Sequence, residues 1–250
     1  MMIKKIQSYK ILAAAALSIV LLLLNMCGKS PDGSGEKVQT ASEIFNKVME
    51  SSGGEKLLMS VGSQTVKGKM IIYAKSGEEE FPMEMIFSYP DKAFVKLAAG
   101  SSEIISVLNG NKGRLIALGM DTDLPDAEIK EMKYRLIRNI AWLTQNLEKG
   151  SLNNTDERSD QENEFIELRF LFEETELKMV VNSKTWLPES YILNEGNDVY
   201  AMKMLNYRKV DGINLPFQYD LLYNQRITTR IIIDEILINS ELKDNIFDLK

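Results

Sequence analysis

The residues that most enzymes use for catalysis are scarce in this sequence. None of its 250 residues is histidine, which excludes Ser-His-Asp triads, Cys-His pairs, histidine bases and the usual zinc sites. Ser240 and Lys243 have the Ser-x-x-Lys spacing of penicillin-binding enzymes, but the companion motifs are missing and we interpret the match as chance. We therefore expect a protein that is not an enzyme, with no cofactor and no metal.

Carboxylates are the remaining groups that could carry chemistry. Asp121, Asp123 and Asp126 are spaced like calcium ligands, yet the loop glycine and terminal glutamate of a calcium loop are absent. Beside Pro125 they are better interpreted as acids at the start of a helix. A hydrolase that uses only carboxylates is a further alternative, although the sequence places no pair of them together.

The single cysteine directly follows an N-terminal targeting segment. Three lysines precede an apolar run at residues 11–24, which has the layout of a secretory signal and is short for a membrane helix. Leu24-Asn25-Met26-Cys27 resembles a bacterial lipobox, although the residue before the cysteine is normally smaller than Met26. We expect residues 1–26 to be a lipoprotein signal peptide and Cys27 to be lipidated. The alternative is a free thiol in an ordinary leader or an uncleaved anchor.

A polar stretch separates this leader from the folded part of the chain. Residues 27–39 are rich in glycine and serine, and we interpret them as a flexible tether after the lipidated cysteine. The folded domain is expected over residues 40–250, because 44% hydrophobic and 26% charged residues are ordinary for a globular chain. The net charge of -6 argues against a nucleic-acid partner.

Alternation of apolar and polar residues predicts about eleven antiparallel strands in this domain. The clearest alternation covers residues 79–89, and residues 199–222 read as a hairpin that turns at Asp211-Gly212. Apolar residues of the last strand, residues 226–238, change faces, which predicts a β-bulge near Asp234 and Glu235. Each strand offers one apolar face, so the sheet must curl around whatever covers it.

Two helices are expected to provide that cover. Thr40 and Glu43 have capping-box spacing, which predicts a helix that ends at Gly53-Gly54. Residues 126–147 carry apolar side chains at helical spacing and predict one long amphipathic helix between two sets of strands. We expect its apolar stripe to cover the concave face of the sheet.

Several short motifs resemble one family of carrier proteins. The helix end at Gly53-Gly54, the strand with Val66-Lys67-Gly68 and the turn Tyr89-Pro90-Asp91-Lys92 resemble the N-terminal half of the outer-membrane lipoprotein carrier and receptor superfamily, LolA and LolB. Residues 207–216 resemble the closing strands of the broader lipoprotein-sorting-like proteins. The resemblance implies a mainly β fold, a single unclosed antiparallel β-barrel with helices as a lid over a cavity for acyl chains.

These observations predict a periplasmic, membrane-tethered lipoprotein that binds lipid or lipoprotein acyl chains in a hydrophobic cavity. It would be anchored to the outer membrane of a bacterial envelope, face the periplasm and contact other envelope proteins. The alternative is a noncatalytic envelope scaffold that binds another protein, and the patterning alone favours a filled core over a hollow one. The expected cavity-lining residues are Met70, Ile72, Phe81, Met83, Met85, Phe87, Ile129, Met132, Leu136, Ile140, Ile166, Leu168, Phe170, Met202, Met204, Leu215 and Phe217.

Overall fold

A computed structural model describes most of the chain from residue 39 onward. The described residues are 39–75, 77–154, 165–172, 175–195, 198–243 and 245–249. The predicted signal peptide, Cys27 and nearly all of the predicted tether lie outside them. Residues 40–250 form one compact unit.

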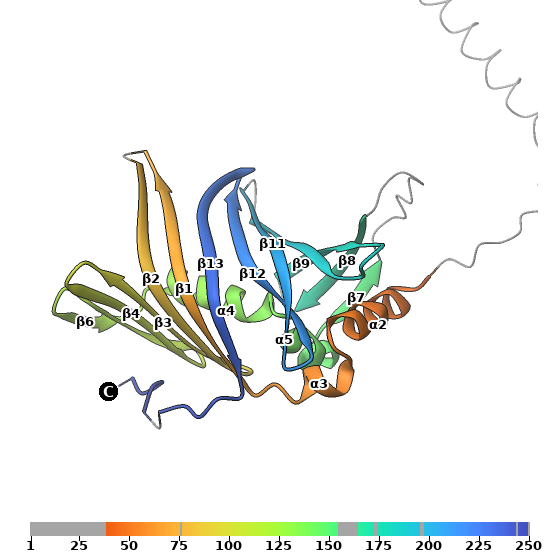
Figure 1. Ribbon diagram of the computed structural model, residues 1–250, viewed down its shortest axis with the longest axis horizontal. Coiled ribbons are helices and arrows are strands. Elements are labelled where there is room, and N and C mark those ends of the chain that lie inside the picture. The colour runs from red at the N-terminus through yellow and green to blue at the C-terminus, as the bar shows by residue number, and fades with distance from the viewer. Residues whose placement is uncertain are drawn as a thin grey trace, which may run out of the picture. The chain divides into compact units, whose positions relative to one another are not determined.

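Thirteen antiparallel strands form one open sheet (Figure 1). Its strand order is β6-β5-β4-β3-β2-β1-β13-β12-β11-β10-β9-β8-β7, so β6 and β7 are the two edges and the sheet is not closed. The predicted mainly β, unclosed antiparallel architecture is confirmed. The strands are β1 (Ser63–Ala74), β2 (Gly77–Ser88), β3 (Lys92–Ala99), β4 (Ser102–Asn109), β5 (Lys112–Ala117), β6 (Met120–Asp123), β7 (Ser151–Asn154), β8 (Phe165–Phe172), β9 (Thr175–Asn182), β10 (Pro188–Glu195), β11 (Asp198–Val210), β12 (Ile213–Tyr223) and β13 (Arg226–Ile238).

The predicted count of eleven strands is wrong, because the two edge strands carry no recognisable pattern. β6 and β7 are each four residues long, and every residue of β6 is exposed. A strand without a buried face needs no alternation of apolar and polar residues. Such strands form because a neighbouring strand offers its free backbone groups, which only the folded sheet provides.

The C-terminal hairpin and the bulge are confirmed. Val210 pairs with Ile213 across a two-residue turn in which Asp211 and Gly212 have φ angles of 48° and 90°. On β13 the register against β1 shifts, since Lys67 pairs with Glu235 while the next residue, Gly68, pairs with Ile233. Asp234 is therefore the extra residue of a β-bulge at the predicted position.

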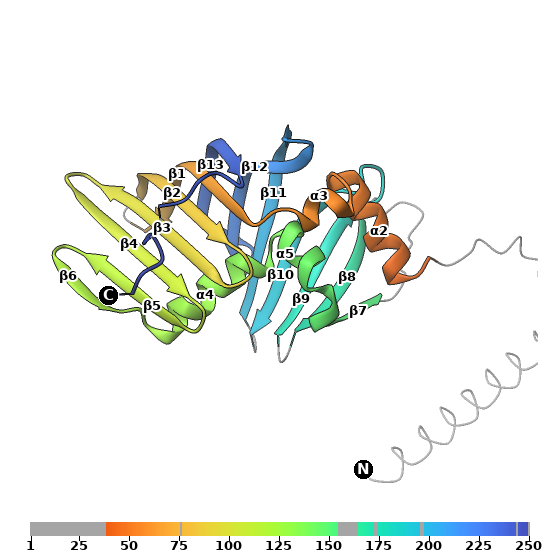
Figure 2. The same ribbon diagram turned by 90° about the horizontal axis from the view of Figure 1, so that it is seen from below.

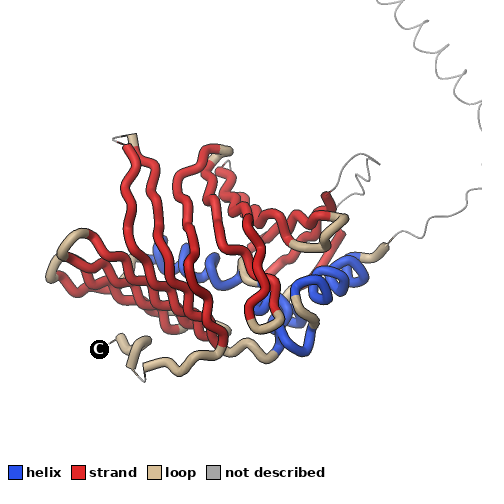
Figure 3. Tube along the Cα trace, in the orientation of Figure 1, coloured by secondary structure: helices blue, strands red, loops and turns tan. Residues whose placement is uncertain are grey.

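The helices lie along the inner side of the curved sheet (Figures 2 and 3). They are α2 (Ala41–Ser52), α3 (Glu55–Met59), α4 (Asp126–Ile137) and α5 (Ile140–Asn146), followed by the 3-10 helix η1 (Leu147–Lys149). The predicted capping box of α2 is present: Thr40 Oγ1 accepts from Glu43 N–H at 3.2 Å, and Glu43 Oε2 accepts from Thr40 N–H at 2.9 Å. The helix then ends at Gly53, whose φ is 139°.

The single helix predicted over residues 126–147 is in fact two helices and a short 3-10 turn. Asn139 has an extended backbone, and its Oδ1 accepts from Ala141 N–H at 2.9 Å, which caps the start of α5. The apolar spacing continues through this break, so periodicity alone does not reveal it. An asparagine between two apolar helical stretches is the one local signal that could have done so.

Candidate cavity between the helices and the sheet

One continuous apolar core joins the inner face of the sheet to the helices. Most of the predicted lining residues are buried in it, namely Met70, Met83, Met85, Phe87, Met132, Leu136, Ile140, Leu168, Phe170, Met202, Met204, Leu215 and Phe217. Ile72, Ile129 and Ile166 are partly buried and pack against this core. Phe81 is half-buried and lies outside it, on the arm of β2 that precedes the first residue paired with β3.

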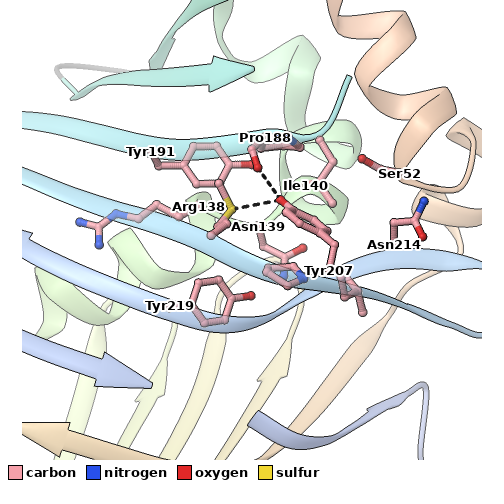
Figure 4. A pocket seen from close by; sticks show the side chains of 12 residues that line it. Ser52, Arg138, Asn139, Ile140, Pro188, Tyr191, Tyr207, Asn214 and Tyr219 are labelled. Atoms are coloured by element: carbon pink, nitrogen blue, oxygen red, sulfur yellow. Dashed lines mark hydrogen bonds between the residues drawn. The ribbon is translucent and has the colours of Figure 1, made fainter. Parts of the chain in front are cut away.

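Two small, adjoining cavities lie between the helices and the sheet. The larger has a volume of about 50 Å³, and its walls are Gln64, Val66, Met85, Phe87, Arg135, Arg138, Asn139, Met202, Tyr219, Leu221 and Ile231. The smaller, of about 20 Å³, is bounded by Ser52, Arg138, Asn139, Ile140, Pro188, Tyr191, Met204, Tyr207, Asn214, Leu215, Pro216 and Tyr219 (Figure 4). Both are far smaller than the roughly 300–1,000 Å³ of a typical ligand pocket, so these two cavities are closed to a ligand of that size in the described state.

The structure brings only part of the predicted site to these cavities. Met85, Phe87 and Met202 line the larger one. Ile140, Met204 and Leu215 line the smaller one. Apart from Phe81, the other predicted residues belong to the packed core or pack against it. The alternation along a strand shows which side chains point inward, but it does not show whether a side chain or empty space lies opposite them.

The break between α4 and α5 places polar groups at both cavities. Asn139 Nδ2 donates to Gln64 Oε1 at 2.9 Å, and the Tyr89 hydroxyl donates to the same oxygen at 3.3 Å. The Arg138 side chain is 3% exposed, and its Nη1 lies 3.9 Å from Glu131 Oε1. Sequence reasoning missed all of these residues, because an isolated polar residue on a strand or between two helices carries no periodic signal.

Three tyrosines from neighbouring strands line the smaller cavity, Tyr191, Tyr207 and Tyr219, and a fourth, Tyr89, interacts electrostatically with Tyr191 and Tyr219. Burial raises the pKa of every one of these phenols well above its usual value near 10, and neighbouring phenols raise the pKa of Tyr89, Tyr191 and Tyr207 further. The four hydroxyls are therefore uncharged at neutral pH. They can donate a hydrogen bond without bringing charge into the core.

Helix α5 is held by both hydrogen bonds and apolar packing, and α4 by apolar packing and the hydrogen bond from Lys133 Nζ to Asn111 Oδ1. Trp142 Nε1 donates to Pro90 O at 2.7 Å, and Gln145 Nε2 donates to Leu58 O at 3.0 Å and to Val61 O at 2.7 Å. The buried residues of α4 are Met132 and Leu136. The two helices are thus separate units joined at Arg138 and Asn139.

The groups considered for catalysis or metal binding do not meet at the cavities. Asp121 and Asp123 lie on exposed β6 rather than at the helix start, and Asp121 forms a two-point ion pair with Arg114. Ser240 follows β13, is half-buried, and its hydroxyl lies 3.2 Å from Thr65 Oγ1, away from both cavities. In the described ranges, no three Asp, Glu, Cys or His residues come together as metal ligands. None of the helices described is both long and apolar enough to cross a membrane.

Comparison with known proteins shows a likeness in structure but not in sequence. No protein-family model and no curated protein matches this chain. An outer membrane lipoprotein-sorting protein domain from Vibrio parahaemolyticus is similar with a TM-score of 0.57 at 10% identity, over 82% of this chain and 95% of that chain. A LolA superfamily protein from Nitrosomonas europaea has a TM-score of 0.57 at 12% identity, over 84% of this chain and 98% of that chain. A DUF1329 family protein from Desulfovibrio piger has a TM-score of 0.58 at 9% identity, over 84% of this chain and 98% of that chain. The open sheet with helices on its inner side is therefore a LolA-like fold.

Proposed function

We propose that this protein is a noncatalytic, membrane-tethered lipoprotein of the bacterial envelope that binds lipid or lipoprotein acyl chains between α4 and the sheet. The observation that supports this most directly is the larger cavity, which lies under a separate helix and is walled mainly by apolar side chains. Met85 and Met202 come to it from opposite halves of the sheet. Unbranched methionine side chains adapt to chains of different shape.

Binding of an acyl chain requires that α4 move away from the sheet. A cavity of about 50 Å³ has no room for such a chain. The extended backbone at Asn139 separates α4 from α5, so α4 can swing while the hydrogen bonds of Trp142 and Gln145 keep α5 in place. In this proposal α4 is the lid and α5 is its fixed base.

The closed core also favours a second candidate function. If α4 stays on the sheet, neither of the two cavities can take an acyl chain, and the protein acts as an envelope scaffold that binds another protein. The small volumes of both cavities support this alternative. Lipid binding by the purified protein separates the two candidates.

We expect the purified protein to bind a fluorescent fatty-acyl probe saturably, and to carry co-purifying lipid in native mass spectrometry. Met202→Trp should weaken probe binding at least tenfold, because the larger side chain occupies the cavity. Met120→Trp is the matched control, since Met120 is 61% exposed on β6 and should leave binding unchanged. Absence of both probe binding and co-purifying lipid from the wild type would leave the scaffold function.

The proposed anchor is tested separately, because Cys27 lies outside the described residues. One of the structurally similar proteins is described as an outer membrane lipoprotein-sorting domain, which supports an envelope location for this chain as well. We expect palmitate labelling of the wild type and its recovery with outer membranes, and release of Cys27→Ala into the soluble fraction without label. Met26→Ala, which makes the lipobox more regular, should label at least as well as the wild type. An unlabelled wild type and a membrane-bound Cys27→Ala would contradict the anchor.

A further inference from the structure

The Tyr191 hydroxyl stands out among the polar groups of the core. Tyr191 lies on β10, is 1% exposed and borders the smaller cavity. Its oxygen has no hydrogen-bond partner among the described residues. A buried hydroxyl without a hydrogen-bond partner destabilises a folded protein. The simplest physical reason for such a hydroxyl in the core is that its partner is absent from the structure.

Two of the neighbouring phenols have hydrogen-bond acceptors in the fold, which Tyr191 lacks. The Tyr207 hydroxyl donates to Pro188 O at 2.7 Å (Figure 4), and the Tyr89 hydroxyl donates to Gln64 Oε1 at 3.3 Å. The fold therefore supplies acceptors for these two groups within the same cluster. The partner of Tyr191 must come from outside the described residues.

The two cavities adjoin, and they differ in character. Arg138, Asn139 and Tyr219 border both of them. The larger cavity has mainly apolar walls, whereas the smaller one ends at hydroxyl and amide groups, including Tyr191 and Asn214. This arrangement fits a molecule with an apolar chain and one polar group at its end.

The charge around Tyr191 indicates that this polar group is neutral. Burial and the neighbouring Tyr219 raise the pKa of the Tyr191 phenol, and no cation is among the causes that shift it. In Figure 4 the Arg138 guanidinium points away from the cluster of phenol rings. An environment that disfavours a phenolate disfavours a carboxylate at the same place.

We propose that Tyr191 is a specificity-determining residue whose hydroxyl donates a hydrogen bond to the neutral carbonyl of a bound acyl ester or amide. The site then takes esterified acyl chains and discriminates against free fatty acids. This inference rests on the proposed acyl-binding function and names the chemical class of its ligand.

The test compares three pyrene-labelled probes of equal chain length: a methyl ester, the free acid at pH 7.5 and an alkane without a carbonyl. We expect the wild type to bind the ester at least tenfold more tightly than the acid. Tyr191→Phe should weaken ester binding about fivefold, the worth of one hydrogen bond, and leave alkane binding unchanged. The midpoint of urea unfolding of Tyr191→Phe should not fall below that of the wild type, because this variant loses a hydroxyl that has no partner in the lipid-free state.

Tyr207→Phe is the matched control. Its hydroxyl already donates to a backbone carbonyl, so this variant should unfold at lower urea while the ratio of ester to alkane affinity stays the same. Unchanged ester binding by Tyr191→Phe would overturn the inference and leave a trapped water molecule as the partner of the Tyr191 hydroxyl. Equal affinity of the wild type for the acid and the ester would also overturn the inference. If the wild type binds the alkane but does not prefer the ester, acyl-chain binding survives and the role of Tyr191 does not. Failure of all three probes overturns both proposals.

Discussion

Leu136→Ala is expected to lower the free energy of unfolding by about 2–5 kcal/mol, the range of buried leucine truncations. Leu136 is 2% exposed on the inner side of α4 and belongs to the same core as Met85 and Phe87. It borders neither cavity, so the substitution removes packed atoms and leaves a new void. Urea unfolding of the lipid-free protein measures the loss.

The same variant reports on the function of α4. If α4 is a lid, weaker packing of α4 lowers the cost of opening, and a bound acyl probe should dissociate faster than from the wild type. Leu171→Ala is the matched control, because Leu171 is 45% exposed on β8. This variant should change neither the free energy of unfolding nor the activation free energy of probe dissociation by more than about 0.5 kcal/mol. A large loss of stability together with no probe binding by the wild type would contradict the lid and support the scaffold. A loss well below 2 kcal/mol would show that α4 is not packed as described.

Gly68→Ala is expected to cost about 3 kcal/mol or more, because the backbone of β13 passes directly over Gly68. A Cβ atom at this position would lie 2.1 Å from Ile232 O and 2.9 Å from Ile233 Cα. Both are backbone atoms of the neighbouring strand and cannot rotate away as a side chain could. The close approach occurs where the bulge at Asp234 shifts the register between β1 and β13.

Gly62→Ala is the control for this position. It lies just before β1, and its added Cβ would meet the Asn239 side chain at an ordinary 3.6 Å, so its unfolding free energy should stay within about 0.5 kcal/mol of the wild type. A similar small change for Gly68→Ala would show that β13 can move away from β1. That outcome would contradict a rigid junction between the two halves of the sheet.

In the proposed function, ligand binding must open the closed state and give the Tyr191 hydroxyl a partner. An acyl chain would have to displace α4 from the sheet, and its burial against the methionine-lined face would offset the cost of that opening. The polar end of the chain would satisfy the phenol that has no partner among the described residues. On this proposal, ligand affinity depends on both the packing of α4 and the hydrogen bond to Tyr191.

The sequence by itself determined the local elements of this protein. Alternation over residues 79–89 and 199–222 predicted strands, Thr40 and Glu43 predicted the start of α2, and Asp211-Gly212 predicted a tight turn. Each of these signals depends on residues a few positions apart, so it can be recognised from the spacing of residue types in the sequence. The resemblance of short motifs to the LolA and LolB superfamily pointed further, to the open antiparallel fold that the structure has.

Only the tertiary structure decided what the inner face of the sheet contains. Tyr89, Tyr191, Tyr207 and Tyr219 come from the end of β2 and from β10, β11 and β12, and they meet because β1 pairs with β13 and joins the two halves of the chain. The break at Asn139, the edge strands and the remaining space of about 50 Å³ under α4 likewise depend on contacts between distant residues. Periodicity shows which side of a strand is apolar. Whether a side chain, a void or a ligand lies opposite is settled by the packing of elements that are far apart in the sequence.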